Sequence, residues 1–289
     1  MAEADESPIF FAKDDDPEMQ QAYESARATF RYCWREMSWE TRRIVPGLDL
    51  AAVKMPFSDG DAADPDSDGP DVEHMWISEV AFDGELITGV LLNSPQWLKT
   101  VSAGDRASVP VAGISDWMYA IRGRVYGAYT VNLLRSRMPA NERKQHDAAW
   151  GLDFGDPAVI QLAPAPNASD APKSGFLGGL FGGKKKPAEP ETTLEPPVEH
   201  PMSVNMEEPW RKQLESDTGS LTIADEDGWL FMHHLALAGS TTAVSLFLEF
   251  GADANSPLPD GRTPLDLAES LGWDATAAVL RAHGGHTSR

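Results

Sequence analysis

Cysteine is nearly absent from this sequence, which has Cys33 alone among its 289 residues. A disulfide within the chain and a zinc site of four cysteine thiolates are therefore both excluded. The sequence also lacks a GxSxG nucleophile motif, a glycine-rich phosphate loop and a pair of histidines at metal-ligand spacing. We accordingly expect this protein to use no cofactor and no metal.

Basic residues and long hydrophobic runs are scarce as well. The chain has 24 Lys and Arg against 45 Asp and Glu, which gives a net charge of −21. Nucleic-acid binding depends on Lys and Arg that displace counterions from phosphates, so we expect no nucleic-acid partner. No run approaches the roughly 18 apolar residues of a membrane span. Because residues 1–16 are acidic, unlike a secretory signal, we expect a cytoplasmic protein.

Proline and glycine, by contrast, are abundant and unevenly placed. Residues 162–201 hold eight of the 22 prolines, a glycine-rich stretch and three consecutive lysines. A segment of this composition buries too little apolar surface to offset the entropy lost on ordering. We therefore predict a disordered linker over residues 162–201, between one domain at 17–157 and another at 203–285.

The first domain combines helices with a meander of strands. From Pro17 onward, apolar residues recur at steps that suit one face of a helix: Met19, Tyr23, Ala26, Phe30, Cys33, Trp34 and Met37. Segments between turn signals predict strands at 51–57, 72–82, 85–92, 106–111 and 114–121, and further helices at 128–137 and 141–150. This order predicts an α+β domain with an antiparallel sheet.

An acidic loop within this domain suggests calcium as a possible ligand. Asp64, Asp66 and Asp68, followed by Gly69, match the first half of an EF-hand loop. The twelfth position of that motif requires a bidentate Glu, and Met75 stands there instead. The flanking segments are also expected to be strands rather than paired helices. We therefore favour a solvated acidic loop, with a weak calcium site as the alternative.

Several short motifs of the first domain occur in a recognisable order. They are Glu73-His74-Met75-Trp76, Gly89-Val90-Leu91-Leu92-Asn93-Ser94-Pro95, Gly104-Asp105, Ile114-Ser115-Asp116-Trp117-Met118-Tyr119 and Gly127-Ala128-Tyr129-Thr130. In this order they resemble the bacterial domain of unknown function 2314 family, over residues 17–138. The resemblance implies a shared fold and no established activity.

Four residues of these motifs could act as acid, base or ligand: Glu73, His74, Asp116 and Tyr119. All four lie on or beside predicted strands, so a catalytic site would require them to converge. The alternative is that they pack a small core or satisfy the amides of turns. We favour this structural role over catalysis.

The second domain contains a repeat. Gly228 and Gly261 stand 261 − 228 = 33 residues apart, each at the start of a similar unit. Thr263-Pro264-Leu265 and Gly251-Ala252-Asp253-Ala254-Asn255 resemble the helix-start and hairpin signatures of ankyrin repeats. The resemblance implies an all-α ankyrin-repeat array of about two units, which residues 209–221 precede as a capping half-repeat.

Ankyrin arrays bind proteins through their hairpin tips and concave helix face. We predict partner-binding residues at the large side chains expected there: Trp229, Leu258, Arg262 and Trp273. For Trp229 and Trp273 the alternative is that they cap the stack, and for Trp273 the two alternatives weigh equally. His233 falls where the family commonly has a structural histidine, so we expect it to pack and hydrogen-bond.

The linker contains a basic and apolar segment. Phe176-Leu177 and Leu180-Phe181 precede Lys184-Lys185-Lys186, a pattern that resembles a small anchor for anionic membranes. The other two alternatives are a peptide that docks on a partner and an inert spacer. The few apolar residues and the net charge of −21 disfavour membrane contact. We therefore favour the spacer.

Two hypotheses for function follow. The first is a non-enzymatic adaptor or regulatory protein that binds another protein. The acidic composition favours a basic partner, such as an enzyme or toxin that this protein restrains. The second is an enzyme in the first domain, to which the repeats bring a protein substrate. The identity of the partner, the oligomeric state and the packing of the two domains depend on structure beyond the sequence pattern.

Overall fold

The first helix, α1 (Pro17–Glu40), begins where the sequence provides a cap. The computed structural model describes residues 16–60, 69–164 and 196–288. In it, the Asp16 carboxylate accepts hydrogen bonds from the Glu18 and Met19 amides. Pro17 stands in the first turn, where its missing N–H leaves no donor unsatisfied. The face that packs on the sheet buries residues of the predicted stripe: Ala26, Phe30, Cys33 and Met37.

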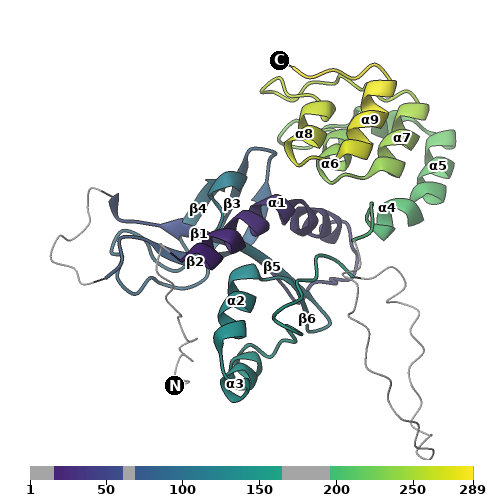
Figure 1. Ribbon diagram of the computed structural model, residues 1–289. Helices are drawn as coiled ribbons and strands as arrows, with labels where there is room; N and C mark the ends of the chain where they lie inside the picture. The colour runs from purple at the N-terminus through teal and green to yellow at the C-terminus, as the bar shows by residue number, and fades with distance from the viewer. Residues whose placement is uncertain (1–15, 61–68, 165–195, 289) are drawn as a thin grey trace, which may run out of the picture.

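Six antiparallel strands form one sheet in the order β4-β3-β2-β1-β5-β6 (Figure 1). They are β1 (Leu50–Phe57), β2 (Glu73–Phe82), β3 (Leu86–Leu91), β4 (Arg106–Pro110), β5 (Asp116–Ile121) and β6 (Arg124–Gly127). Val53 of β1 lies opposite Ile77 of β2 and Trp117 of β5. The predicted α+β domain with an antiparallel sheet is confirmed.

The sheet has a core on each face. Trp117 and Tyr119 of β5 belong to the core that α1 covers, whereas Met118 and Ala120 belong to a second, smaller core. This alternation is the period of two that a strand imposes on its side chains. Two helices near the smaller core complete this part of the chain: α2 (Tyr129–Arg137) and α3 (Ala140–Trp150).

The C-terminal part is helical. It contains α4 (Pro201–Asn205), α5 (Glu207–Ser216), the 3-10 turn η3 (Gly219–Thr222), α6 (Phe231–Leu237), α7 (Thr241–Glu249), α8 (Pro264–Ser270) and α9 (Asp274–Ala282). Thr263 caps α8, because its side-chain oxygen accepts a hydrogen bond from the Asp266 amide, while the Thr263 amide donates to the Asp266 carboxylate in a capping box. Gly239 and Gly272 follow α6 and α8 at φ of 65° and 66°, a left-handed conformation that favours glycine.

Two sequence predictions fall outside the described residues. They concern the calcium candidates Asp64, Asp66 and Asp68, and residues 165–195 of the linker, so both stay predictions. At the far end of the predicted linker, α4 begins at Pro201 and His200 is already buried. None of the described helices is both long and apolar enough to span a membrane.

The two parts of the chain pack against each other and share one hydrophobic core. Tyr32 of α1 meets the Trp273 ring edge-on, with ring centroids 6.2 Å apart. Trp39, at the end of α1, stacks on His200 and on Trp210 of α5. In Figure 1 the C-terminal helices accordingly lie beyond the far end of α1. We call this contact region the domain junction.

Candidate functional site

Glu73 is the first residue of β2, and its side chain holds a loop in place. Its carboxylate accepts hydrogen bonds from the backbone amides of Gln96 at 2.9 Å, Trp97 at 2.5 Å and Leu98 at 3.1 Å. The side chain is buried, so these three donors replace the water that it lost on folding. Glu73 is thus fully engaged by the loop that follows β3.

Asp116 is the first residue of β5, and its side chain binds the start of α2. Its carboxylate accepts hydrogen bonds from the Trp117 and Tyr129 amides and from both the amide and the hydroxyl of Thr130. Complete burial raises the pKa of Asp116, while the hydrogen bonds from Thr130 and the nearby Lys54 charge oppose that rise. A carboxylate at a helix N-terminus is favoured by the helix dipole as well.

The other two catalytic candidates have different surroundings. His74 Nδ1 lies 2.5 Å from the Ser115 hydroxyl oxygen, and its ring stacks on Tyr23. The Tyr119 hydroxyl donates to the Leu162 carbonyl oxygen at 3.0 Å, and burial raises the pKa of Tyr119 well above its usual value. The four candidates therefore make four separate sets of contacts rather than one shared set.

Ser115 is the residue near these candidates that the sequence did not single out. Its hydroxyl is paired with His74, as a nucleophile is paired with a base, but Ser115 is 1% exposed. The available sequence signal was its place beside Asp116 in the Ile114–Tyr119 motif. Within residues 16–60, 69–164 and 196–288, no three His, Cys, Asp or Glu side chains are grouped as metal ligands.

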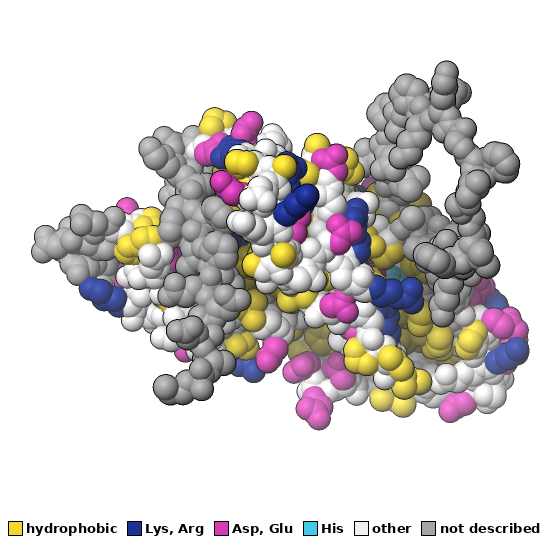
Figure 2. Space-filling model, turned by 90° about the horizontal axis from the view of Figure 1, so that it is seen from below, with side chains coloured by type: hydrophobic (Ala, Val, Ile, Leu, Met, Phe, Trp, Pro, Cys, Tyr) yellow, Lys and Arg dark blue, Asp and Glu magenta, His cyan; other side chains and the backbone are white. Residues whose placement is uncertain are grey.

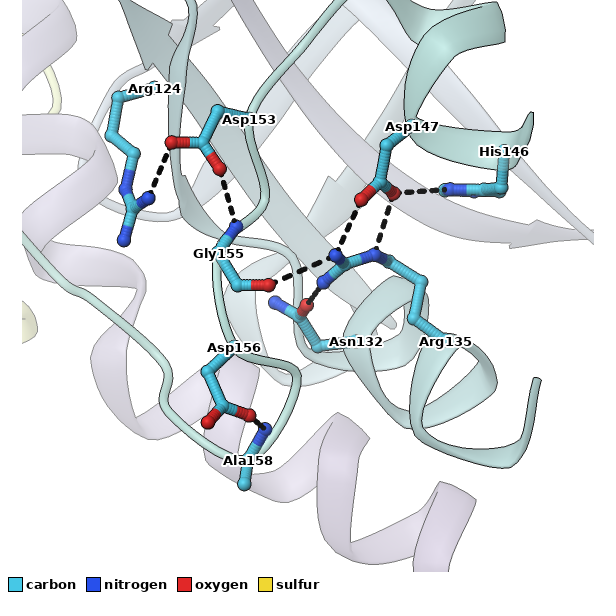
Figure 3. Close-up of polar contacts among 9 residues, drawn as sticks. All are labelled: Arg124, Asn132, Arg135, His146, Asp147, Asp153, Gly155, Asp156 and Ala158. Carbon is cyan, nitrogen blue, oxygen red and sulfur yellow. Dashed lines mark hydrogen bonds and ion pairs between the residues drawn. The ribbon is translucent and has the colours of Figure 1, made fainter. Parts of the chain in front are cut away.

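A buried arginine lies at the centre of a polar cluster of the first part (Figure 3). Arg135 of α2 donates two hydrogen bonds to the Asp147 carboxylate of α3, at 2.8 and 2.7 Å, and others to Asn132 and the Gly155 carbonyl oxygen. Partial burial raises the pKa of Asp147, but the hydrogen bonds and charges of Arg135 and His146 together outweigh it and hold that pKa below its usual value. The cluster fastens α3 and the following segment to α2.

The predicted partner-binding residues are mostly engaged within the chain. Leu258 and Trp273 are buried, and the Trp273 indole N–H donates to the Leu237 carbonyl oxygen at 3.0 Å. Arg262 donates to the Asp83 carbonyl oxygen of the β2–β3 turn at 2.7 Å. Trp229 is half-buried and stacks on His234. Whether a partner contacts any of the four stays a prediction.

The domain junction uses a second face of α1 that the sequence did not identify. Arg31 donates to the Gly272 carbonyl oxygen at 2.9 Å, and Arg35 donates to the Pro197 carbonyl oxygen at 2.7 Å. Glu36 lies 2.7 Å from Arg43 and 3.2 Å from His200 Nε2. Residues 31, 35 and 39 follow a helical step of four, a signal that could have indicated a second buried face.

The face of the molecule shown in Figure 2 is mixed in character. Acidic and basic side chains are interspersed there, and hydrophobic side chains are exposed in small groups between them. Over the whole surface of the described residues, the exposed large hydrophobic side chains are Ile44, Val45, Leu86, Leu92, Val198, Val204 and Ile223. On this face, then, charge of a single sign does not gather into one patch.

Comparison with known proteins gives one family match and two relatives. Residues 16–154 match the family model described as "Uncharacterized protein conserved in bacteria (DUF2314)". The chain is 40% identical over 276 residues, 95% of its length, to 97% of the "Putative ankyrin repeat protein NMB1133/NMB1171" of Neisseria meningitidis serogroup B (strain ATCC BAA-335 / MC58). It is 31% identical over 94 residues, 32% of its length, to 56% of the "Uncharacterized protein YegJ" of Escherichia coli (strain K12). No solved structure matches it significantly.

Proposed function

We propose that this chain, which belongs to one family with the N. meningitidis protein and matches the DUF2314 model over residues 16–154, is a non-enzymatic protein-binding protein. In this proposal its C-terminal helices form an ankyrin-repeat array. The relative's name supports a role in protein interaction. The proposed partner is a basic protein, an enzyme or toxin that this chain restrains or positions, since a net charge of −21 steers basic surfaces toward it.

The observation that carries this proposal is the 33-residue period of the helices themselves. α6 starts at Phe231 and α8 at Pro264, and 264 − 231 = 33. α7 starts at Thr241 and α9 at Asp274, and 274 − 241 = 33. The period of the sequence is thus also the period of two helix pairs, as in a stacked repeat whose surface presents side chains to a partner.

The position of the helix pairs narrows the surface available to a partner. A Cβ added to Gly84 in the β2–β3 turn would lie 2.9 Å from a Leu267 methyl carbon and 3.7 Å from a Leu237 methyl carbon. One face of α6 and α8 is therefore already covered by the first part of the chain. We assign Arg262, Trp273 and Leu258 to contacts within the chain and Trp229 to the partner.

Trp229 suits such a role by its surroundings. It is half-buried, so its ring is fixed by His234 while part of it stays accessible. The acids Asp225, Glu226 and Asp227 directly precede it and are exposed. A rigid aromatic side chain with acidic neighbours is a suitable anchor for an apolar and basic patch on another protein.

A purified-partner experiment tests the proposal. The full chain is used to capture binding proteins from its native lysate, and each candidate is then purified and titrated against the wild type by calorimetry. Trp229→Ala should weaken the Kd by about 30-fold, as loss of a hot-spot side chain does. Leu92→Ala, an exposed apolar residue of the first part, should leave the Kd unchanged. Equal affinity for wild type and Trp229→Ala would contradict the assignment.

The alternative is an enzyme in the first part, with the C-terminal helices recruiting a protein substrate. The observation that favours it is the 2.5 Å contact between His74 Nδ1 and the Ser115 hydroxyl. It ranks second because Ser115 is buried, while Glu73 and Asp116 are saturated by amide donors. A fluorophosphonate probe tests this alternative: labelling of wild type that is abolished by Ser115→Ala would favour the enzyme over the binding protein.

A further inference from the structure

The C-terminal helices contain an apolar pocket of about 110 Å³ beside the domain junction. Its lining consists of Trp210, Gln213, Leu214, Ser220, Phe231 and Phe247. The Trp210 ring meets the rings of Phe231 and Phe247 edge-on, with centroids 5.4 and 5.8 Å apart. Pockets for drug-sized ligands occupy about 300–1,000 Å³, so this one suits a single large apolar side chain.

The charge around the pocket is acidic on the side of Ser220, whereas Arg42 lies over the Phe231 ring, 5.2 Å from its centroid. No Lys or Arg occurs between Lys212 and Arg262, the stretch that supplies most of the lining. The exposed acids of the segment around Ser220 are Glu215, Asp217, Asp225, Glu226 and Asp227. A ligand that enters from the side of Ser220 therefore combines one apolar side chain with positive charge that faces these acids.

The chain itself contains such a ligand. We propose that the basic and apolar segment Phe176–Lys186, which lies outside the described residues, docks on this pocket, with Leu180 or Phe181 filling it and Lys184, Lys185 and Lys186 near the acids. The array would then bind a peptide of its own chain. This inference is independent of the partner proposed for Trp229.

The path of the chain brings the segment to the pocket. The chain enters the described region again at Pro196, and the next residue, Pro197, accepts a hydrogen bond from Arg35. His200 stacks on Trp39 and Trp39 stacks on Trp210, so the chain that follows the segment is held at His200, two ring contacts away from the pocket. Fifteen residues from Phe181 to Pro196 reach at most about 50 Å when extended.

Tethering favours this segment over a separate protein of the same chemistry. A short linker holds a peptide at an effective concentration in the millimolar range near its site. A separate basic peptide would need to reach such a concentration in solution before it could compete. The tether therefore compensates for the small apolar area that one side chain buries in a pocket of this size.

Disulfide trapping in the full chain tests the proposal. Ser220→Cys places a thiol in the pocket lining and Gly179→Cys places one beside Leu180, while the native Cys33 is buried and out of reach. The rate of the 179–220 disulfide is measured by mass spectrometry after digestion. A matched chain carries the same two cysteines and Phe176→Ser, Leu177→Ser, Leu180→Ser and Phe181→Ser.

Docking predicts that the four serine substitutions slow the trapping by about tenfold, because only the tether then brings the thiols together. High salt should slow it as well, since it screens lysines from acids. An equal rate in the two chains overturns the proposal. The proposal is also overturned if, in a mixture of isotopically light and heavy chains, the 179–220 disulfide joins two different chains, because the pocket then binds the segment of a second copy. A third outcome also overturns the proposal. If the chain sediments with phosphatidylglycerol vesicles only when the four apolar residues are present, and these residues do not speed the trapping, the segment is a membrane anchor.

Discussion

The hydrogen bonds of the buried His233 ring depend on its protonation state. Its Nδ1 accepts the Leu230 amide at 2.9 Å, so the proton of the neutral ring lies on Nε2, which donates to the Ser256 carbonyl oxygen at 2.8 Å. A second proton on Nδ1 would face the Leu230 N–H and break that bond. Burial lowers the pKa of His233 below its usual 6.5.

This pKa shift predicts acid sensitivity of the C-terminal helices. Since the native pKa lies below the unfolded value, the unfolded chain binds more protons as the pH falls. The stability that depends on neutral His233 is thus present above about pH 6.5 and lost progressively toward the native pKa. NMR titration of the ring should show the His233 midpoint below that of histidines in the urea-unfolded chain. A midpoint at or above the unfolded one would contradict the prediction.

Gly239 illustrates a different constraint at single-residue scale. Its φ is 65°, and an added Cβ would lie 2.3 Å from the Trp273 ring. Gly251 also has a positive φ, of 92°, but nothing lies within 4 Å of its added Cβ. Comparison of the two positions separates backbone strain from a steric clash.

Gly239→Ala should therefore lower the free energy of unfolding by about 1–3 kcal/mol more than Gly251→Ala, because the clash forces Trp273 to move. Urea unfolding of the two variants at one pH measures the difference. If both substitutions lower the free energy of unfolding equally, Trp273 does not pack on Gly239 as described.

At the scale of elements, the packing of α2 and α3 against each other depends on a polar contact. They contribute few residues to the smaller core, and α3 buries only His146 among its eleven residues. The guanidinium of Arg135 replaces the missing apolar contact, because it binds Asp147 of α3 with two hydrogen bonds and lies over the Phe154 ring. A planar bidentate pair of this kind orients both helices.

Arg135→Met should destabilise the first part by about 3 kcal/mol, because Asp147 then keeps only its contact with His146 and the Gly155 carbonyl oxygen loses the arginine donor. The matched control is Arg137→Met in the same helix, where the arginine is 40% exposed and pairs with Asp16 and Glu18. That control should change stability little, since water replaces the lost partners. Thermal unfolding compares the two variants, and similar losses would contradict a special role for Arg135.

At the scale of the whole molecule, the domain junction fixes how the two parts are oriented. α1 contributes Arg31, Tyr32 and Trp39 to one side of it, and the β2–β3 turn reaches Arg262 on the other. These contacts join elements up to 241 residues apart in sequence. A partner held by the C-terminal helices would therefore be held at a defined place relative to the sheet.

Arg262→Glu should open this side of the junction, because it removes the hydrogen bond to Asp83 and places a carboxylate beside the acidic turn. Hydrogen exchange of residues 83–88 should become faster, with the helical content unchanged by circular dichroism. Arg281→Glu is the control, since Arg281 is exposed and pairs only with Glu269 in the described structure. Unchanged exchange in Arg262→Glu would show that the junction does not depend on this contact.

The sequence by itself determined the elements whose signals are local. Pro17 and the apolar steps that follow it define α1, strand-like segments between turn signals define five of the six strands, and the 33-residue spacing recurs in the helix starts. β6 escaped prediction because four residues are too short to show a period. The calcium candidates lie outside the described residues.

Only the tertiary structure decided which surfaces meet. Glu73 and Asp116 have residue types common in active sites, yet loop and helix amides 13 to 25 residues away saturate them. For Trp273 the sequence left capping and partner binding equally open, and in the structure its ring packs on Gly239 and meets Tyr32 of α1. A local period encodes how a segment folds, whereas the packing of distant segments follows from shape and burial over the whole chain.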